Sequence, residues 1–97
     1  MIRIPETFQL VNRTWRVEWV AMKKAKIKGE TDFDAAVIKL NTTIRDDVEV
    51  ARHTFVHELL HATSNAMGWD DVNDDESRID ALAALILQAL DSAQGSV

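Results

Sequence analysis

The first half of the chain contains short runs in which apolar and polar residues alternate. In TWRVEWV, the apolar residues Trp15, Val17 and Trp19 alternate with charged or polar ones. This two-residue period is typical of a strand with one buried face. The β-rich run TFQLV precedes it, and Asn12-Arg13 between the two runs is suited to a tight turn. The pattern therefore predicts two adjacent strands near the N-terminus.

A third strand is predicted in AAVIKLNTTI, where an apolar run is closed by polar residues. The segment KGETDFD just before it carries Gly29, Asp32 and Asp34, which are turn residues, and is expected to be a turn. Residues 1–45 are thus expected to form a small sheet of about three strands.

The second half of the chain has the spacing of two helices. The first is predicted over residues 46–67, from Asp46, with Glu49 as its capping-box partner, to a stop near Gly68. The second is predicted over residues 74–91. Its apolar residues recur every three to four positions: Ile79, Ala83, Ile86 and Leu90.

Composition narrows the class of protein. A chain of 97 residues, 46% hydrophobic and 28% charged, fits one globular domain over residues 1–97. The predicted fold class is α+β, a small N-terminal sheet packed on two helices. The net charge of −5 disfavours nucleic acid as a partner, and the longest apolar run is too short to span a membrane. The one basic cluster, KKAKIK at residues 23–28, is interpreted as a solvated loop or edge.

The chain has no cysteine. This excludes disulfides, thiolate zinc ligands and a thiol nucleophile. The N-terminus also has no apolar run long enough for a signal peptide, and both features together predict a cytoplasmic protein.

The segment HELLH, residues 57–61, carries the candidate chemistry. Histidines four positions apart on a helix lie about 40° apart around its axis and roughly 6 Å along it, so their rings can converge on one metal ion. Glu58 leaves the helix about 100° from His57, where it can reach a water in an open coordination position. The surrounding apolar residues argue against an exposed helix with two unrelated histidines. The spacing therefore predicts metal binding by His57 and His61.

A zinc site needs a third protein ligand. His53 lies one turn before His57, and three histidines along one straight helix would span about 12 Å, too far for one ion. A carboxylate from the second helix is therefore expected. Glu76 is favoured because it shares the inward face of that helix, although a capping box with Asn73 would also explain it. Asp80, one turn further, is either the alternative ligand or an acceptor for a histidine N–H.

Two more residues are candidates near the substrate. His53 is interpreted as a partly exposed residue near the cleft, with substrate or oxyanion binding as the alternative. Arg78 is interpreted as a solvated charge paired with Asp74. Because the chain has no tyrosine to stabilise an oxyanion, four other residues are candidates for that role: Arg78, His53, Arg52 and Asn65.

With these residues assembled, the chain resembles a known group. The segment TFVHELLHAT followed by ESRIDALAALILQAL is similar to the small zincin-like metallopeptidases of phages and bacterial mobile elements, which are distantly akin to the ImmA/IrrE group. GETDFDAAVIKLN is similar to that group's turn and strand. The resemblance implies a minimal zincin-like fold and a gluzincin-like site: His57, His61 and Glu76 as ligands of one Zn²⁺, and Glu58 as general base. It also implies that the strand AAVIKLN lies beside the cleft, where such an edge binds an extended peptide.

The predicted function is a zinc-dependent metallopeptidase that hydrolyses peptide bonds through a zinc-activated water. Its expected partner is a peptide or protein substrate, and a second copy of the chain or a protein partner is a candidate to complete the cleft. The alternative is a zinc-stabilised, non-catalytic protein-binding module with a vestigial peptidase site. A third hypothesis is an α+β interaction domain that binds no metal.

Overall fold

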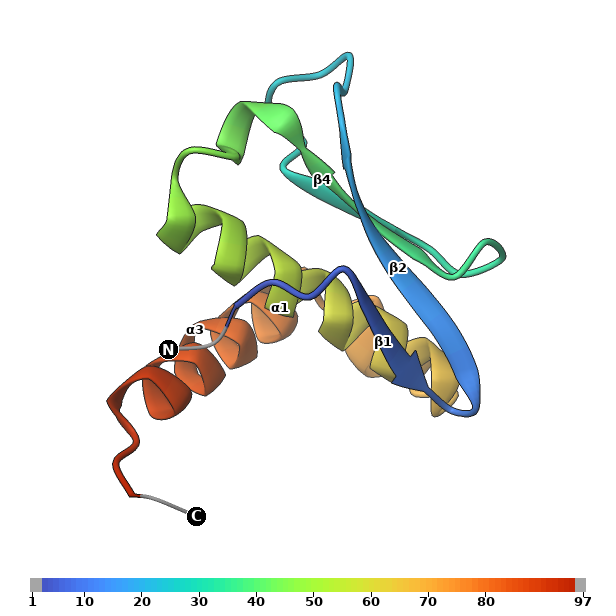
Figure 1. Ribbon diagram of the computed structural model, residues 1–97. Coiled ribbons are helices and arrows are strands. Elements are labelled where there is room, and N and C mark those ends of the chain that lie inside the picture. The colour runs from blue at the N-terminus through green and yellow to red at the C-terminus, as the bar shows by residue number, and fades with distance from the viewer. Residues whose placement is uncertain (1–2, 96–97) are drawn as a thin grey trace.

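The computed structural model describes residues 3–95, which form a four-stranded sheet and two long helices (Figure 1). Helix α1 lies between the sheet and α3, so it contacts both. The α+β class predicted from the sequence is confirmed. The elements in chain order are β1 Thr7–Leu10, β2 Arg13–Val20, β3 Gly29–Asp32, β4 Val37–Asn41, a 3-10 turn Thr42–Ile44, α1 Val48–Ala66, α2 Asp70–Asn73 and α3 Glu76–Ser92.

The sheet has the order β1-β2-β4-β3. Strands β2 and β4 are parallel, and the other two pairs are antiparallel. The turn between β1 and β2 is formed by Val11 and Asn12, at φ 50° and 59°, rather than by Asn12 and Arg13. Two consecutive positive φ values are the geometry of a type I′ hairpin turn. An exposed valine there is unusual because its branched side chain crowds the left-handed backbone.

The prediction of three strands was wrong, because GETD forms the additional edge strand β3. Its polar residues suggested a turn, but they pair with β4 in register from Gly29 opposite Leu40 to Asp32 opposite Val37. The turn itself follows this strand, where Oδ1 of Asp32 accepts a hydrogen bond from the Ala35 amide at 3.0 Å. A short polar edge strand has too little apolar alternation to be recognised locally.

Strand β4 ends at Asn41, earlier than the predicted third strand. The side chain of Asn41 accepts from the Thr43 amide and starts a 3-10 turn at Thr42. An asparagine side chain that competes for the following amides commonly ends an extended segment in this way.

The two long helices form close to the predicted positions. Asp47 rather than Asp46 caps α1, accepting from the Val50 amide at 3.2 Å. After Ala66 the chain reaches Gly68 at φ 70°, the left-handed geometry that commonly follows a helix end. Part of the predicted connection forms the single-turn helix α2.

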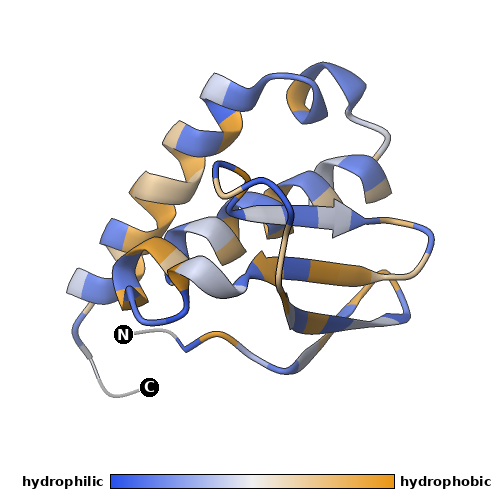
Figure 2. Ribbon diagram, turned by 90° about the horizontal axis from the view of Figure 1, so that it is seen from above, coloured by the Kyte–Doolittle hydropathy of each residue, from blue (hydrophilic) through white to orange (hydrophobic). Residues whose placement is uncertain are grey.

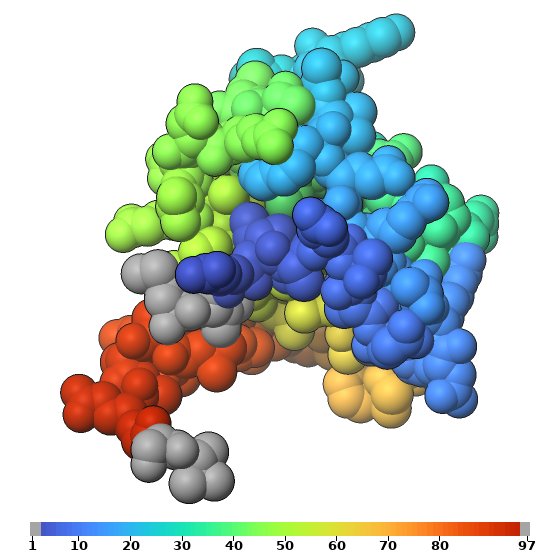
Figure 3. Space-filling model, in the orientation of Figure 1, coloured from blue at the N-terminus to red at the C-terminus, as the bar shows by residue number. Residues whose placement is uncertain are grey.

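Hydrophobic packing between the layers places α1 at the centre of the molecule. Apolar positions gather along β4 and continue along α3 (Figure 2). In Figure 3, yellow atoms of α1 are visible between the N-terminal segment and α3. Phe8 of β1 contributes by stacking on Trp15 and meeting Phe55 edge-to-face, with ring centroids 6.0 and 5.9 Å apart. Arg52 of α1 also forms an ion pair with Asp91 of α3.

The inward stripe of α3 differs from the predicted one. Ile79 and Ala83 are fully buried against α1, and Leu87 continues their row at a spacing of four. Ile86 and Leu90, which were predicted to share this stripe, are 36% and 47% exposed. Helix α3 packs mainly against α1, with a smaller contact to α2, so only a narrow row of its side chains becomes buried. Within residues 3–95, no helix combines the length and apolar character needed to cross a membrane.

Candidate metal centre

Helix α1 presents His57 and His61 side by side. The two residues are one turn apart, and their ring centroids are separated by 5.0 Å. Both side chains are largely buried, with exposed fractions of 16% and 13%. Because α1 packs against the sheet on one side, the histidine face can meet side chains from α3.

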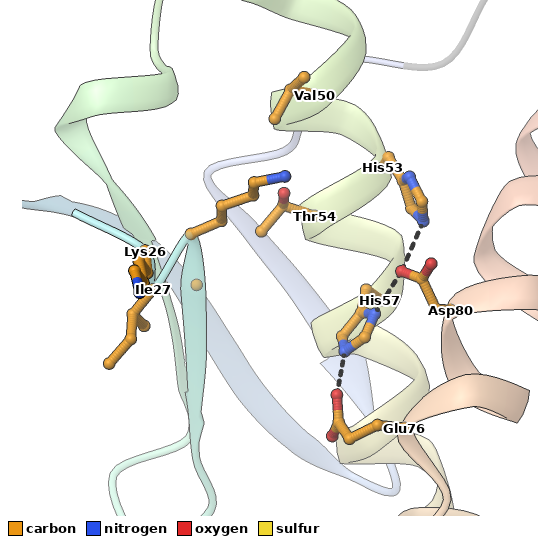
Figure 4. Close-up of a pocket in the computed structure, with 10 residues that line it drawn as sticks. Lys26, Ile27, Val50, His53, Thr54, His57, Glu76 and Asp80 are labelled. Atoms are coloured by element: carbon orange, nitrogen blue, oxygen red, sulfur yellow. Dashed lines mark hydrogen bonds and ion pairs between the residues drawn. The ribbon is translucent and has the colours of Figure 1, made fainter. Parts of the chain in front are cut away.

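The first turn of α3 supplies the carboxylate that meets both rings. Oε2 of Glu76 lies 3.1 Å from Nε2 of His57, and Oε1 lies 2.7 Å from Nε2 of His61 (Figure 4 shows the former). The helix is capped by Asp75, which accepts from the Arg78 amide at 3.0 Å. The capping-box interpretation, in which Asn73 starts the helix, was therefore wrong, and the Glu76 carboxylate is directed to the histidines instead.

These three side chains could hold a metal ion. One ligand atom from each of His57, His61 and Glu76 lies within 4.8 Å of the others. Two imidazole nitrogens and a carboxylate oxygen form a donor set that suits divalent transition metals. Three protein ligands would leave a tetrahedral site with one open position.

Each histidine is oriented by a hydrogen bond on its other nitrogen. Nδ1 of His57 lies 3.1 Å from Oδ1 of Asp80, and Nδ1 of His61 lies 2.8 Å from Oδ1 of Asn73. An acceptor at Nδ1 keeps the proton there and leaves the Nε2 lone pair for a metal. Asp80 is thus placed to accept a hydrogen bond from His57, which is one of its two predicted roles. Asn73 was missed, because no local pattern links it to a histidine twelve positions earlier.

Replacing Asn73 by alanine is expected to weaken metal binding by about 10- to 100-fold, the usual effect of losing a group that orients a ligand. The His61 ring would lose the acceptor that fixes its rotation and tautomer. Competition with a chromophoric zinc chelator measures the affinity. Asp71→Ala, at an exposed position of the same short helix, is the control. Equal affinity of Asn73→Ala and the parent protein would contradict the assigned role.

His53 lies next to the site but does not belong to the ligand group that contains Glu76. Its Nε2 is 3.1 Å from Oδ1 of Asp80, and its side chain is 36% exposed, in keeping with a partly exposed residue near the cleft. His53, His57 and Asp80 form a second group whose ligand atoms lie within 4.8 Å of one another. The two groups share His57 but use opposite nitrogens of its ring. An ion in one group would therefore lie on the opposite side of this imidazole from an ion in the other.

Arg78 does not line the cleft that is lined by His53 and His57. Its Nε lies 3.5 Å from Oδ2 of Asp75, and its side chain is 54% exposed. The ion pair predicted with Asp74 is thus made with Asp75. The prediction failed because Asp75 caps α3 and is already held beside the Arg78 backbone.

Glu58 points from α1 toward the edge strand rather than toward α3. The hydroxyl of Thr31 donates to its Oε1 at 2.8 Å, and Oε2 lies 4.0 Å from Nε2 of His57. Burial raises the pKa of the Glu58 carboxyl above its usual range, although the Thr31 hydrogen bond and the two histidines oppose this shift. Thr31 was missed because its segment was expected to be a turn.

Close approach between β3 and α1 depends on Gly29. A Cβ at this position would lie 2.7 Å from Cγ2 of Thr54 and 3.2 Å from Cγ of Glu58. Gly29→Ala is therefore expected to lower the free energy of unfolding by about 1–3 kcal/mol, as overpacking of a core does. Urea denaturation measures the change, with Glu30→Ala on the same strand as the control. Unchanged stability would mean that β3 can move away from α1 at little cost.

His53 and His57 line a cleft of about 410 Å³. One wall consists of residues 26–29, and the other is formed by α1 and the start of α3 (Figure 4). The strand beside this cleft is β3. The expectation that AAVIKLN lies there was wrong, because β4 is paired on both sides and lies inside the sheet.

Comparison of the chain with known proteins gives no match to a protein-family model, to a curated protein or to a solved structure.

Proposed function

We propose that this protein is a zinc-dependent peptidase with a minimal, gluzincin-like site. The observation that carries the proposal is the convergence of His57, His61 and Glu76, with the buried Glu58 adjacent to them. Two histidines, one carboxylate and an open fourth position are characteristic of catalytic rather than structural zinc. When bound, Zn²⁺ would polarise the substrate carbonyl and lower the pKa of a water to about 7.

Glu58 is proposed as the general base. Its Oε1 is held by Thr31, while Oε2 faces His57 Nε2 at 4.0 Å. A carboxylate in this position would take a proton from the attacking water and return it to the leaving amine. A raised pKa suits this exchange, because a general base works best when its pKa lies close to the operating pH.

The edge strand supports a peptide as the substrate. Strand β3 pairs with β4 on one side, so its other side offers unpaired backbone groups next to the cleft. An extended peptide could add to this edge through main-chain hydrogen bonds. The Thr31 hydrogen bond to Glu58 would then connect the substrate-binding strand directly to the proposed base.

A non-catalytic, zinc-stabilised binding module is the second candidate. The observation in its favour is that Arg78 is paired with Asp75 outside the cleft, in a chain without tyrosine. Of the other predicted candidates for stabilising an oxyanion, His53 lines the cleft, whereas Arg52 and Asn65 do not. A binding module would retain zinc and the peptide-binding edge but would not hydrolyse peptides.

The test combines metal analysis with a peptide library. Purified protein is reconstituted with Zn²⁺, its metal content is measured, and it is incubated with degenerate peptides whose products are identified by mass spectrometry. One zinc per chain together with zinc-dependent cleavage is the expected result. One zinc per chain with peptide binding but no cleavage would favour the binding module, and the absence of stoichiometric zinc would contradict both.

A further inference from the structure

The basic cluster at residues 23–28 contributes to the wall of the cleft. Lys26 and Lys28 line it opposite His53 and His57, whereas Lys23 and Lys24 belong to the same loop but do not line it. All four lysines are exposed. Within the described part of the chain, the ion pairs formed by lysine involve only Lys39, so Lys26 and Lys28 have no carboxylate partner.

Asn41 fixes the backbone that carries these two lysines. Its side-chain Nδ2 donates to the carbonyl oxygen of Ile27 at 2.7 Å, and its backbone amide donates to that of Lys28 at 2.8 Å. Asn41 is fully buried, and its remaining side-chain oxygen accepts from the Thr43 amide. A buried amide with all these bonds satisfied holds its partners in place. Lys26 and Lys28 are thus attached to the interior of the sheet rather than to a free loop.

The charges around the cleft make these lysines distinctive. Glu76 and Asp80 lie on the other wall, where a bound divalent ion would offset them. The ammonium groups of Lys26 and Lys28 would then be uncompensated, in a chain whose net charge is −5. A local positive wall inside a cleft attracts an anionic group even when the protein as a whole is acidic.

We infer that Lys26 and Lys28 select substrates that place a carboxylate against this wall while the scissile bond lies at the metal centre. This inference rests on the proposed peptidase function and specifies its substrate class. The carboxylate has two chemical sources in a peptide. It is either the side chain of an aspartate or glutamate near the scissile bond, or the C-terminal carboxylate of the peptide.

Two degenerate peptide libraries distinguish these sources. One library has amidated C-termini and the other has free C-termini, and cleavage sites in both are identified by mass spectrometry. If the side chain is recognised, Asp and Glu are enriched about 10-fold over Asn and Gln at one position in both libraries, a size expected for two partly exposed charge contacts. If the terminus is recognised, cleavage occurs at a fixed distance from the end of the free peptides only.

The double substitution Lys26→Gln and Lys28→Gln is expected to abolish the preference. The matched control is Lys23→Gln with Lys24→Gln, which removes the same charge from the same loop outside the cleft and should keep the preference. In the parent protein the preference should also shrink in 0.5 M salt, because salt screens exposed charges. Equal cleavage of acidic and neutral sequences with no requirement for a free C-terminus, or a preference that survives loss of Lys26 and Lys28, would overturn the inference.

A binding measurement separates this inference from the proposed function. Three fluorescein-labelled hexapeptides are titrated with the zinc-loaded protein, and anisotropy reports binding. They are an amidated peptide with glutamate, its amidated glutamine analogue, and the glutamine peptide with a free C-terminal carboxylate. At least one of the two carboxylate-bearing peptides should bind about 10-fold more tightly than the amidated glutamine peptide, and the Lys26/Lys28 variant should bind all three equally. Absence of cleavage in both libraries would contradict the peptidase proposal alone, while equal binding of all three peptides to the parent protein would contradict the carboxylate inference alone.

Discussion

Replacing Glu58 by glutamine is expected to lower the rate of peptide hydrolysis by about 10²- to 10⁴-fold, which is the usual contribution of a general base. Glutamine has nearly the same shape and keeps an oxygen that can accept the hydrogen bond from Thr31. It cannot take a proton from water. The expected loss is therefore in kcat, measured with any peptide that the library identifies.

Zinc binding should be retained in Glu58→Gln, because the three proposed ligands are untouched. Metal content and zinc affinity are measured on the same preparation. Glu30→Gln, which removes a carboxylate from the exposed face of β3, is the matched control and should leave kcat unchanged. Hydrolysis at the parental rate would rule out Glu58 as the base, and loss of zinc would show that Glu58 is a ligand.

Removal of the metal is expected to produce the largest change in stability. Free zinc at about 1,000 times its dissociation constant would stabilise the folded protein by about 4 kcal/mol. Each kcal/mol changes the melting temperature of a domain of this size by about 4–8 °C. Addition of a strong chelator should therefore lower the melting temperature by more than about 10 °C in the parent protein.

His57→Ala should lose this zinc-dependent stabilisation, because His57 belongs to both candidate ligand groups. Melting with zinc and with chelator is compared within each variant, so that any loss of packing cancels. His53→Ala is the informative control. It should keep the response if the ion is bound by His57, His61 and Glu76, and lose it if the ion is bound by His53, His57 and Asp80. A parent protein that melts equally with zinc and with chelator would contradict the metal site altogether.

Local patterns were sufficient for the helical part of the site. The relation between His57 and His61 follows from the geometry of one helix turn, which any four-residue spacing on a helix obeys. Glu76 was predicted as the third ligand by a similar local argument, because the apolar row of its own helix indicates which face of that helix points inward. The structure brings these three residues together as predicted, and the zinc itself remains a proposal.

The β-rich part was harder to predict, because its pairing depends on distant residues. Strand β3 has four residues and no apolar alternation, so it is recognisable only through its partner β4 and through α1. Thr31 was missed for the same reason, although it is the hydrogen-bond partner of the proposed base. Asn73 was assigned to a helix cap that Asp75 occupies instead.

By itself, the sequence determined what local geometry enforces: two helices, a histidine pair one turn apart, and a carboxylate at the start of the second helix. The tertiary structure decided which groups surround them. It brought Thr31 within hydrogen-bonding distance of Glu58, and Asn73 within hydrogen-bonding distance of His61. It also made the loop with Lys26 and Lys28 part of the wall of the cleft. The physical reason is that backbone periodicity acts over three or four residues, whereas these contacts join segments that only the packing of the sheet against α1 and α3 brings together.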